Sequence, residues 1–321
     1  MNEEILIIQR LKKYYPIRRG FFAQEPVLVK AVDGVDLTIR RGETLGLVGE
    51  SGCGKSTLGR LILRLEDPDE GTITFEGENI LSFDDDQLRK FRRNIQIIFQ
   101  DPYSSLNPRK KVDFIIGEPL AIHGLARGKE LEERVVELMK VVGLRAEQRF
   151  LYPHQFSGGQ RQRIGIARAL ALQPKLVIAD EPVSSLDVSI QAQIVNLLLD
   201  LQSEFGLTYL FISHDLNLIE YVSDWVAVMY LGKTVEWANQ EVIYDHPIHP
   251  YSEALFSAVP TTDPLTKRKR ILLEGDVPSP INPPSGCRFH TRCPLRIDFC
   301  EKEEPLLNKR PNGSLVACHV R

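Results

Sequence analysis

One run of residues near the start of the chain constrains the fold more than any other feature. It reads Gly49-Glu-Ser-Gly-Cys-Gly-Lys-Ser-Thr57 and fits the pattern G-x-x-x-x-G-K-[ST] at every position. An apolar segment (44–48) precedes it and a helical pattern (58–65) follows it. Backbone N–H groups and the N-terminus of a helix can then surround phosphate groups. The sequence therefore predicts a nucleoside triphosphate site in preference to a glycine-rich surface turn.

The residues of this run have separate expected roles. Its three glycines allow a tight turn and a close approach of backbone to ligand. Lys55 is expected to reach the β- and γ-phosphates, and the Ser56 hydroxyl to ligate Mg²⁺. The other expected nucleotide contacts in the run are Gly49, Ser51, Gly52, Cys53, Gly54 and Thr57.

Composition and charge narrow the class of protein. The chain has 321 residues, of which 43% are hydrophobic and 26% charged, as in soluble globular proteins. No apolar run approaches the roughly 18 uncharged residues of a membrane helix, and the first residues lack the pattern of a secretory signal. We expect a cytosolic protein that reaches a membrane only through a partner. The net charge of −3 argues against wholesale nucleic-acid binding.

Hydrophobic patterns predict an α/β fold with more than one part. Apolar β-rich segments before residue 48 predict a small antiparallel sheet, and residues 84–160 predict a helical subdomain with an amphipathic helix at 130–142. Alternating strands and helices then return. They are expected at 176–179, 190–205, 208–212, 225–230 and 234–237. Residues 1–258 are expected to form a nucleotide-binding domain, and the proline-rich residues 259–321 a loop-rich extension.

Two carboxylates end a predicted strand in the second half of the chain. Asp180 and Glu181 follow the apolar residues 176–179, and strand ends are where an α/β sheet presents side chains to its ligand. Asp180 is expected to hold Mg²⁺ through its water shell. Glu181 is expected to orient or deprotonate an attacking water molecule.

A second anion-binding pattern lies between these two elements. Ser157, Gly158, Gly159 and Gln160 precede a helix expected at 164–172, so they stand at a helix N-terminus. A chain with one phosphate loop needs no second phosphate site of its own. The pattern therefore indicates that phosphate is shared between two subunits.

These motifs together resemble the nucleotide-binding subunit of an ATP-binding cassette (ABC) transporter, with an ABC-type phosphate-loop ATPase core. The run Ser157-Gly-Gly-Gln is similar to the defining motif of that family, although Phe156 stands where leucine is more usual. The resemblance implies a switch role for His214, a magnesium-sensing role for Gln100 and an interface role for Asp187. It also implies an aromatic residue that stacks on adenine, for which Tyr15 is the first choice. Its rivals are Tyr14 and Phe22.

Four of the five cysteines are gathered near the C-terminus: Cys287, Cys293, Cys300 and Cys318. In a reducing cytosol such crowding indicates a metal or cluster site more than disulfides. Their spacing is wider than the C-x₂₋₄-C pairs of tetrahedral zinc sites. Four thiolates, one of them followed by proline, suit an iron–sulfur cluster better. Zinc or free thiols stay open as alternatives, and the neighbouring His290 and His319 are not expected to be ligands.

The cysteine tail and the residues 14–20 resemble the second of the two paired ATPases of oligopeptide and dipeptide importers, some of which carry a [4Fe–4S] cluster. The resemblance implies ATP hydrolysis coupled to peptide import at the cytoplasmic face of the membrane. It further implies two membrane-spanning permease subunits, a non-identical partner ATPase (or a second copy), and an extracytoplasmic peptide-binding protein. Alternatives are a nickel or sugar importer, a soluble ABC ATPase, and a tail that senses metal and gates the ATPase.

Overall fold

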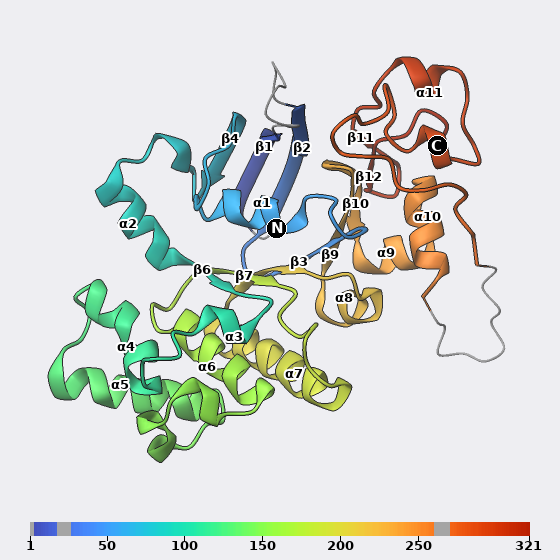
Figure 1. Cartoon of the computed structure of the whole chain (residues 1–321). Helices are drawn as coiled ribbons and strands as arrows, with labels where there is room; N and C mark the ends of the chain where they lie inside the picture. The colour runs from blue at the N-terminus through green and yellow to red at the C-terminus, as the bar shows by residue number, and fades with distance from the viewer. Residues whose placement is uncertain (1–2, 18–26, 260–269) are drawn as a thin grey trace. The chain divides into compact units, whose positions relative to one another are not determined.

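The computed structural model describes residues 3–17, 27–259 and 270–321. The chain forms two compact units, one of Met1–Ser82 with Ile212–Arg321 and the other of Phe83–Phe211. Both units combine strands with helices (Figure 1), so the predicted α/β fold class is confirmed. In the described parts of the chain, no helix is both long and apolar enough to cross a membrane.

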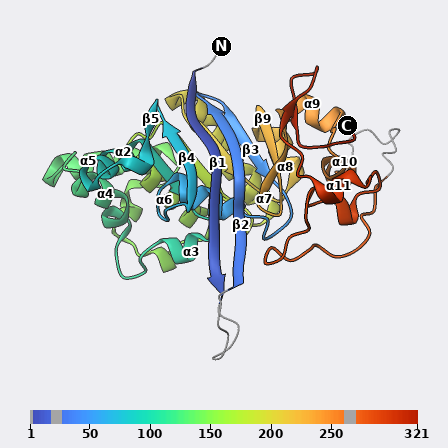
Figure 2. The same cartoon turned by 90° about the horizontal axis from the view of Figure 1, so that it is seen from above.

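The first unit begins with an antiparallel sheet of four strands in the order β2-β1-β4-β5. They are β1 (Glu4–Ile17), β2 (Val27–Arg40), β4 (Glu70–Phe75) and β5 (Glu78–Asn79). β1 and β2 lie side by side along their length (Figure 2). Alternate residues of a strand face opposite sides, and Ile8, Val35 and Ile73 are among those buried on the core side. The small antiparallel sheet predicted at the start of the chain is confirmed.

A second group of strands in the first unit leads into the nucleotide-binding loop. These strands follow the order β11-β12-β10-β9-β3. The elements of this part are β3 (Thr44–Val48), α1 (Lys55–Ile62), η1 (Ile80–Ser82), α8 (Leu216–Val222), β9 (Trp225–Tyr230), β10 (Lys233–Asn239), α9 (Gln240–Asp245) and α10 (Pro250–Ser257). β3 is parallel to β9 and buried in all five residues. A fully apolar, two-sided strand is what its sequence predicts.

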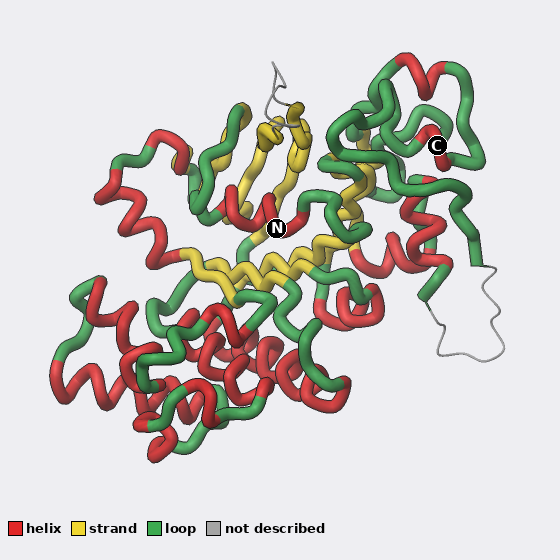
Figure 3. The backbone as a smooth tube through the Cα atoms, viewed as in Figure 1, coloured by secondary structure: helices red, strands yellow, loops and turns green. Residues whose placement is uncertain are grey.

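The C-terminal extension is mostly loop (Figure 3), as its proline content predicts. Its short elements are η4 (His290–Arg292), α11 (Phe299–Lys302), β11 (Asn308–Lys309) and β12 (Leu315–Val316). β12 pairs with β10, where Val316 lies opposite Glu236. Phe289 is buried against Tyr230 and Tyr251, with ring centroids 5.3 and 5.4 Å away. The extension therefore belongs to the first unit by both strand pairing and packing.

The second unit holds three strands in the order β8-β7-β6 and most of the helices. Its elements are α2 (Asp85–Asn94), β6 (Ile95–Ile98), α3 (Pro102–Ser105), α4 (Val112–Ile122), α5 (Gly128–Val141), η2 (Ala146–Phe150), η3 (Pro153–Gln155), α6 (Gly158–Leu170), β7 (Leu176–Asp180), α7 (Val188–Phe205) and β8 (Thr208–Ile212). β6 and β7 are parallel. The sequence did not predict β6, a four-residue strand within a stretch of helical pattern.

The start of α6 differs from its prediction. The expected helix began at residue 164, whereas α6 begins at Gly158. Ser157 caps it by accepting a hydrogen bond from the Gln160 backbone N–H, and the Gln160 side chain accepts one from the Ser157 N–H. This capping box satisfies two N–H groups that a helix start leaves open. It outweighs the low helix propensity of two successive glycines.

Candidate nucleotide-binding site

The phosphate loop (residues 49–57) joins β3 to α1 in the first unit. Gly54 has φ 108°, and a Cβ atom there would lie 2.1 Å from the carbonyl oxygen of Ala31. Gly49 has φ 150°, and its Cβ would lie 2.2 Å from the carbonyl oxygen of Met229. Only glycine fits backbone packed this closely at positive φ. The loop is thus held in one shape by the strands β2 and β9 beside it.

The helix that follows begins at Lys55, earlier than the predicted residue 58. The first N–H groups of a helix have no intrahelical partner and carry a partial positive charge. Lys55 is the first residue of α1, so the N-terminus of this helix lies within the phosphate loop and is suited to bind phosphate.

The Lys55 side chain contacts the backbone of the phosphate loop. Its Nζ donates to the carbonyl oxygens of Gly49 and Glu50, at 2.8 and 3.2 Å. The Cys53 sulfur lies 3.8 Å from the same nitrogen, and Lys55 is only 6% exposed. Burial raises the pKa of the Cys53 thiol, against the opposing effect of the Lys55 charge. A buried ammonium whose partners at these distances are uncharged is ready to exchange one of them for a phosphate oxygen.

Tyr14 and Tyr15 differ in their surroundings. The Tyr15 hydroxyl donates to the Glu66 carboxylate and also lies within reach of the Thr57 hydroxyl on α1. Burial, followed by the bond to Glu66, raises the pKa of Tyr15 to about 12. The Tyr14 hydroxyl instead donates to Asp33. Tyr15 is therefore the tyrosine beside the helix of the phosphate loop, and Phe22 lies outside the described residues.

The catalytic candidates of the second unit meet at the end of β7. The amide Nε2 of Gln100 donates to Oε2 of Glu181 at 2.8 Å, although 81 residues separate them in sequence. Glu181 has φ 45°, a conformation that costs a non-glycine residue free energy and often marks a functional site. Asp180 is the last residue of β7 and is half-buried. The unpredicted strand β6 ends just before Gln100. Because β6 pairs with β7, Gln100 lies close to Glu181 at the end of β7.

The second anion-binding pattern lies at the N-terminus of α6. A Cβ on Gly159 would lie 2.5 Å from Cγ2 of Ile190, and one on Gly158 would lie 3.1 Å from Cδ2 of Leu186. The two glycines therefore let α6 approach the segment that starts α7, whose N-cap is Asp187. Ser157 itself is exposed. The N-cap of this 13-residue helix therefore lies at the surface.

His214 lies beside β3, the strand that precedes the phosphate loop. The preceding residue, Ser213, donates its N–H to the carbonyl oxygen of Leu47 in β3 at 3.3 Å. Asp215 caps α8 by accepting from the backbone N–H groups of Asn217 and Leu218. These contacts on either side fix the backbone of His214, which is exposed.

The four C-terminal cysteines are free thiols that lie in one module of the first unit. Burial raises the pKa of Cys287 to about 11; the Phe289 N–H opposes this rise, and the three other thiols add to it. Burial also raises the pKa of Cys293, where the Leu295 N–H acts in the opposite direction.

The arrangement of these thiols does not form a site for a single metal ion. Among the described residues, no three His, Cys, Asp or Glu side chains are placed to hold one. His290 Nδ1 lies 2.8 Å from the carbonyl oxygen of Cys287, and His319 Nε2 lies 2.9 Å from that of Glu303. Both histidines thus lie within hydrogen-bond distance of a backbone carbonyl oxygen. The side chains as placed do not fit zinc.

Sequence reasoning missed Glu50, one of the variable positions of the phosphate loop. Its two carboxylate oxygens accept from Nη1 of Arg292 at 3.2 and 3.1 Å. Its N–H donates to the Tyr251 hydroxyl at 3.0 Å. A charged residue inside a loop that binds anions was the signal available in the sequence.

Two family models match the chain. The one described as ABC transporter matches residues 32–184, and the one described as oligopeptide/dipeptide transporter, C-terminal region, matches residues 235–300. The first range holds the phosphate loop, Gln100, Ser157 and Glu181. The second ends at Cys300.

Curated proteins match over nearly the whole chain. The oligopeptide transport ATP-binding protein AppF of Bacillus subtilis is 54% identical over 99% of this chain and 98% of its own length. The dipeptide transport ATP-binding protein DppF of Haemophilus influenzae is 52% identical over 99% and 97%. The oligopeptide transport ATP-binding protein OppF of Escherichia coli is 54% identical over 94% and 92%.

Solved structures extend the comparison to the fold. A dimeric, post-hydrolysis state of the ATP-binding cassette MJ0796 bound to ADP and Pi has a TM-score of 0.65 and 30% identity. It covers 73% of this chain and 98% of its own. The structure of cbiO1 from Clostridium perfringens has a TM-score of 0.64 and 28% identity. With full-length relatives above 50% identity and both family models in place, the chain belongs to the ABC transporter family, in the branch that carries the oligopeptide/dipeptide transporter C-terminal region.

Proposed function

We propose that this chain binds ATP at its phosphate loop and hydrolyses it to drive import of oligopeptides or dipeptides through a membrane ABC transporter. The shape of the loop is the observation that supports ATP binding most strongly. Gly49 and Gly54 bring its backbone against β9 and β2, and α1 begins at Lys55, so the N-terminus of this helix lies within the loop. In this proposal Tyr15 stacks on adenine, because its hydroxyl lies beside α1 of the same loop.

Mg²⁺ is proposed to bind residues that carry oxygen donors. Ser56, Asp180 and Gln100 offer hydroxyl, carboxylate and amide oxygens, and Mg²⁺ prefers oxygen ligands. When bound, Mg²⁺ neutralises charge on the β- and γ-phosphates. The backbone of residues 49–57 then binds the remaining phosphate oxygens, with Lys55 between the β- and γ-groups.

Hydrolysis is proposed to use the pair formed by Gln100 and Glu181. The Glu181 carboxylate accepts a proton from the attacking water, and its hydrogen bond to the Gln100 amide holds one oxygen in place. His214 is proposed to contact the γ-phosphate, because its backbone is fixed beside β3.

A pair of cassettes is proposed to share each ATP. Ser157, Gly158, Gly159 and Gln160 of one chain supply the N-terminus of α6 to the γ-phosphate held by the other, with Asp187 at the interface. The exposed Ser157, which is the N-cap of α6, supports this assignment. The partner cassette is a non-identical ATPase or a second copy. ATP binding then stabilises the closed pair, and hydrolysis releases it.

The transported solute is proposed from the relatives and from the C-terminal region. Each of the three relatives described above carries out oligopeptide or dipeptide transport according to its name. In this proposal residues 1–258 are the nucleotide-binding domain, and their helical part (84–160) docks on two permease subunits at the cytoplasmic face of the membrane. An extracytoplasmic protein delivers the peptide. Residues 259–321 form the extension.

Reconstitution in lipid vesicles tests this function. The chain is purified with its permeases and partner ATPase, and ATP hydrolysis is measured with the binding protein loaded with dipeptide, oligopeptide, nickel or sugar. Stimulation by peptide, lost in the Lys55→Ala variant, is the expected result. Stimulation by nickel or sugar but not by peptide would show that the transported solute is not a peptide. Full hydrolysis without the permeases would place the chain among ATPases that do not act in transport.

The [4Fe–4S] cluster on Cys287, Cys293, Cys300 and Cys318 stays a prediction from the sequence. The observation in its favour is that four free thiols lie in the C-terminal extension of the first unit. Against it, no described group of side chains forms a metal site. Iron, sulfide and zinc determined per chain after anaerobic purification decide the question. About four irons and four sulfides, lost on Cys→Ser substitution, would establish the cluster.

A further inference from the structure

Two arginines of the C-terminal extension reach the part of the first unit that binds nucleotide. They are Arg288 and Arg292, which lie between Cys287 and Cys293. Each pairs with a carboxylate more than 240 residues earlier in the chain, because the hydrogen bonds span 255 and 242 positions. The extension is thus tied to β2 at one point and to the phosphate loop at another.

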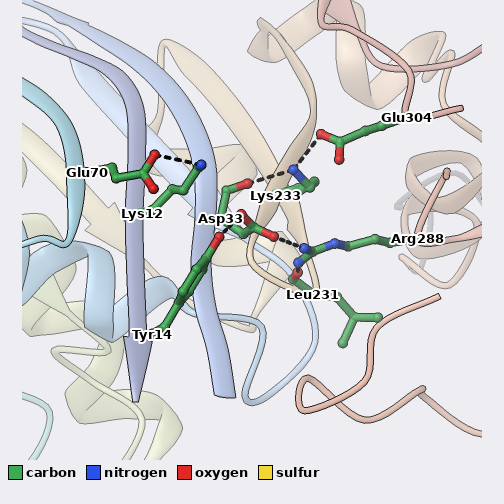
Figure 4. Close-up of polar contacts among 8 residues, drawn as sticks. All are labelled: Lys12, Tyr14, Asp33, Glu70, Leu231, Lys233, Arg288 and Glu304. Atoms are coloured by element: carbon green, nitrogen blue, oxygen red, sulfur yellow. Dashed lines mark hydrogen bonds and ion pairs between the residues drawn. The ribbon is translucent and has the colours of Figure 1, made fainter. Parts of the chain in front are cut away.

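Arg288 forms a buried ion pair with Asp33 at the centre of a polar network (Figure 4). The exposed fractions of the two side chains are 6% and 11%. Asp33 also accepts from the Tyr14 hydroxyl, and Arg288 donates its other nitrogen to the carbonyl oxygen of Leu231. Lys233 donates to the Asp33 carbonyl oxygen at 2.7 Å. Charges buried this deeply and paired on both sides hold their elements in one arrangement.

The backbone around Asp33 continues to the phosphate loop. The Asp33 N–H donates to the carbonyl oxygen of Gly232 at 2.8 Å, and the Gly232 N–H donates to that of Cys53 at 2.9 Å. Cys53 lies in the loop, two residues before Lys55. Arg288 therefore fixes the turn between β9 and β10 (residues 231–232), whose backbone is hydrogen-bonded to the phosphate loop.

Arg292 contacts the loop directly. Its Nη1 donates to both carboxylate oxygens of Glu50, and only 8% of its side chain is exposed. The Glu50 side chain is 29% exposed. The Glu50 carbonyl oxygen in turn accepts from Lys55. One residue of the loop thus links the arginine of the extension to the lysine that is to meet the phosphates.

The charges of Glu50 and Arg292 indicate how this contact affects nucleotide binding. Glu50 places a negative charge in a loop that is to bind a strongly negative ligand, and the two would repel each other. Arg292 neutralises the charge of Glu50 in a partly buried ion pair, where solvent screens the charges less than at the surface. It also restricts the loop to one conformation before the ligand arrives, which lowers the ordering cost of binding.

We propose that Arg292 is a positioning residue for ATP: through Glu50 it neutralises and orders the phosphate loop, so that the C-terminal extension sets the affinity of the site. This inference rests on the proposed binding of ATP. Arg288 serves the same end by holding the extension on β2. The arginines act through residues of the cassette and do not contact the nucleotide themselves.

Binding of a fluorescent ATP analogue to the purified full-length chain tests the proposal. Arg292→Met should weaken binding roughly three- to tenfold. Arg296→Met is the matched control, since Arg296 is an exposed arginine of the same module, and it should bind as the wild type does. Arg292→Lys should recover part of the loss, because it restores charge without the planar guanidinium.

The Glu50→Gln background separates the proposed role from a general loss of structure. With no charge at Glu50 to neutralise, adding Arg292→Met should change affinity less than twofold. In steady-state hydrolysis by the reconstituted complex, Arg292→Met should raise KM and leave kcat unchanged. Equal affinities for Arg292→Met and wild type, or the same loss in both backgrounds, would overturn the proposal. Failure of the wild type itself to bind the analogue would instead overturn the ATP site.

Discussion

Replacing Arg288 by methionine measures what the buried pair with Asp33 contributes to stability. Methionine keeps most of the volume of the side chain and removes its charge, leaving Asp33 at 8% exposure without its cation. Removing one partner of a buried pair typically costs about 3–5 kcal/mol. The Tyr14 hydroxyl remains bonded to Asp33, so we expect a loss near the lower end, about 3 kcal/mol in the free energy of unfolding.

The dependence of this loss on pH identifies its cause. Burial acts to raise the pKa of Asp33, but the Tyr14 hydroxyl, Arg288 and Lys233 together lower it below its usual value. A carboxyl whose pKa is lowered in the folded state stabilises the protein above its unfolded pKa of about 3.9, and this contribution is lost as pH falls through the folded value. Without Arg288, one of the groups that lower this pKa is gone, so the carboxyl becomes protonated at a higher pH than in the wild type. The difference between wild type and variant should therefore be full at pH 7 and shrink below about pH 4.

Urea unfolding followed by tryptophan fluorescence provides the assay. Both tryptophans, Trp225 and Trp237, lie in the first unit with their rings stacked at 4.3 Å, so they report on the unit that contains the pair. Lys12→Met is the matched control, because it breaks an ion pair at the surface of the same unit, between Lys12 and Glu70 (Figure 4). The side chains of Lys12 and Glu70 are 31% and 63% exposed. This variant should change stability far less. A loss in Arg288→Met no larger than in this control, or one that is equal at pH 3.5 and pH 7, would refute the reasoning.

Four further predictions concern the nucleotide site and the packing of the two units. Lys55→Ala should abolish ATP binding in calorimetry, and retained affinity would remove the lysine from its role. Glu181→Gln should keep ATP bound while turnover falls at least about a hundredfold; normal turnover would contradict its assignment as the base. Gly46→Ala should cost about 1–3 kcal/mol in urea unfolding, because the new Cβ would lie 2.5 Å from Oγ of Ser223. Gly165→Ala, whose Cβ meets nothing within 4 Å inside α6, should instead stabilise by about 0.5–1 kcal/mol.

Features encoded by consecutive residues could be predicted from the sequence. The phosphate loop is one, because its glycines, lysine and flanking apolar strand lie within a single short stretch. The strand that ends in Asp180 and Glu181 is another. The start of α6 was misplaced because Gly158 and Gly159 weaken a helical pattern, although Ser157 and Gln160 already form the S-x-x-Q capping box.

Contacts between distant parts of the chain could not be predicted. Gln100 and Glu181 are joined through β6 and β7, whose pairing depends on the fold of the whole unit. Arg288 and Arg292 gave no local signal, since arginines beside cysteines occur in many solvent-exposed loops. Their partners are defined only when the extension folds back on β2 and the phosphate loop. The cysteines, in contrast, were visible as a group from their spacing but not by their geometry.

The pairing of β12 with β10 has a consequence for the solubility of the cassette. A strand at the border of a sheet offers unpaired N–H and C=O groups to any other chain that can extend along it. β12 covers β10 at Glu236 and Trp237, and β11 closes the sheet beyond it with only two residues, Asn308 and Lys309. Both residues of β11 are exposed and one is a lysine, features that discourage further strand addition. A cassette cut off before its extension would leave β10 without this partner at Glu236 and Trp237, and the uncovered edge would favour aggregation edge to edge.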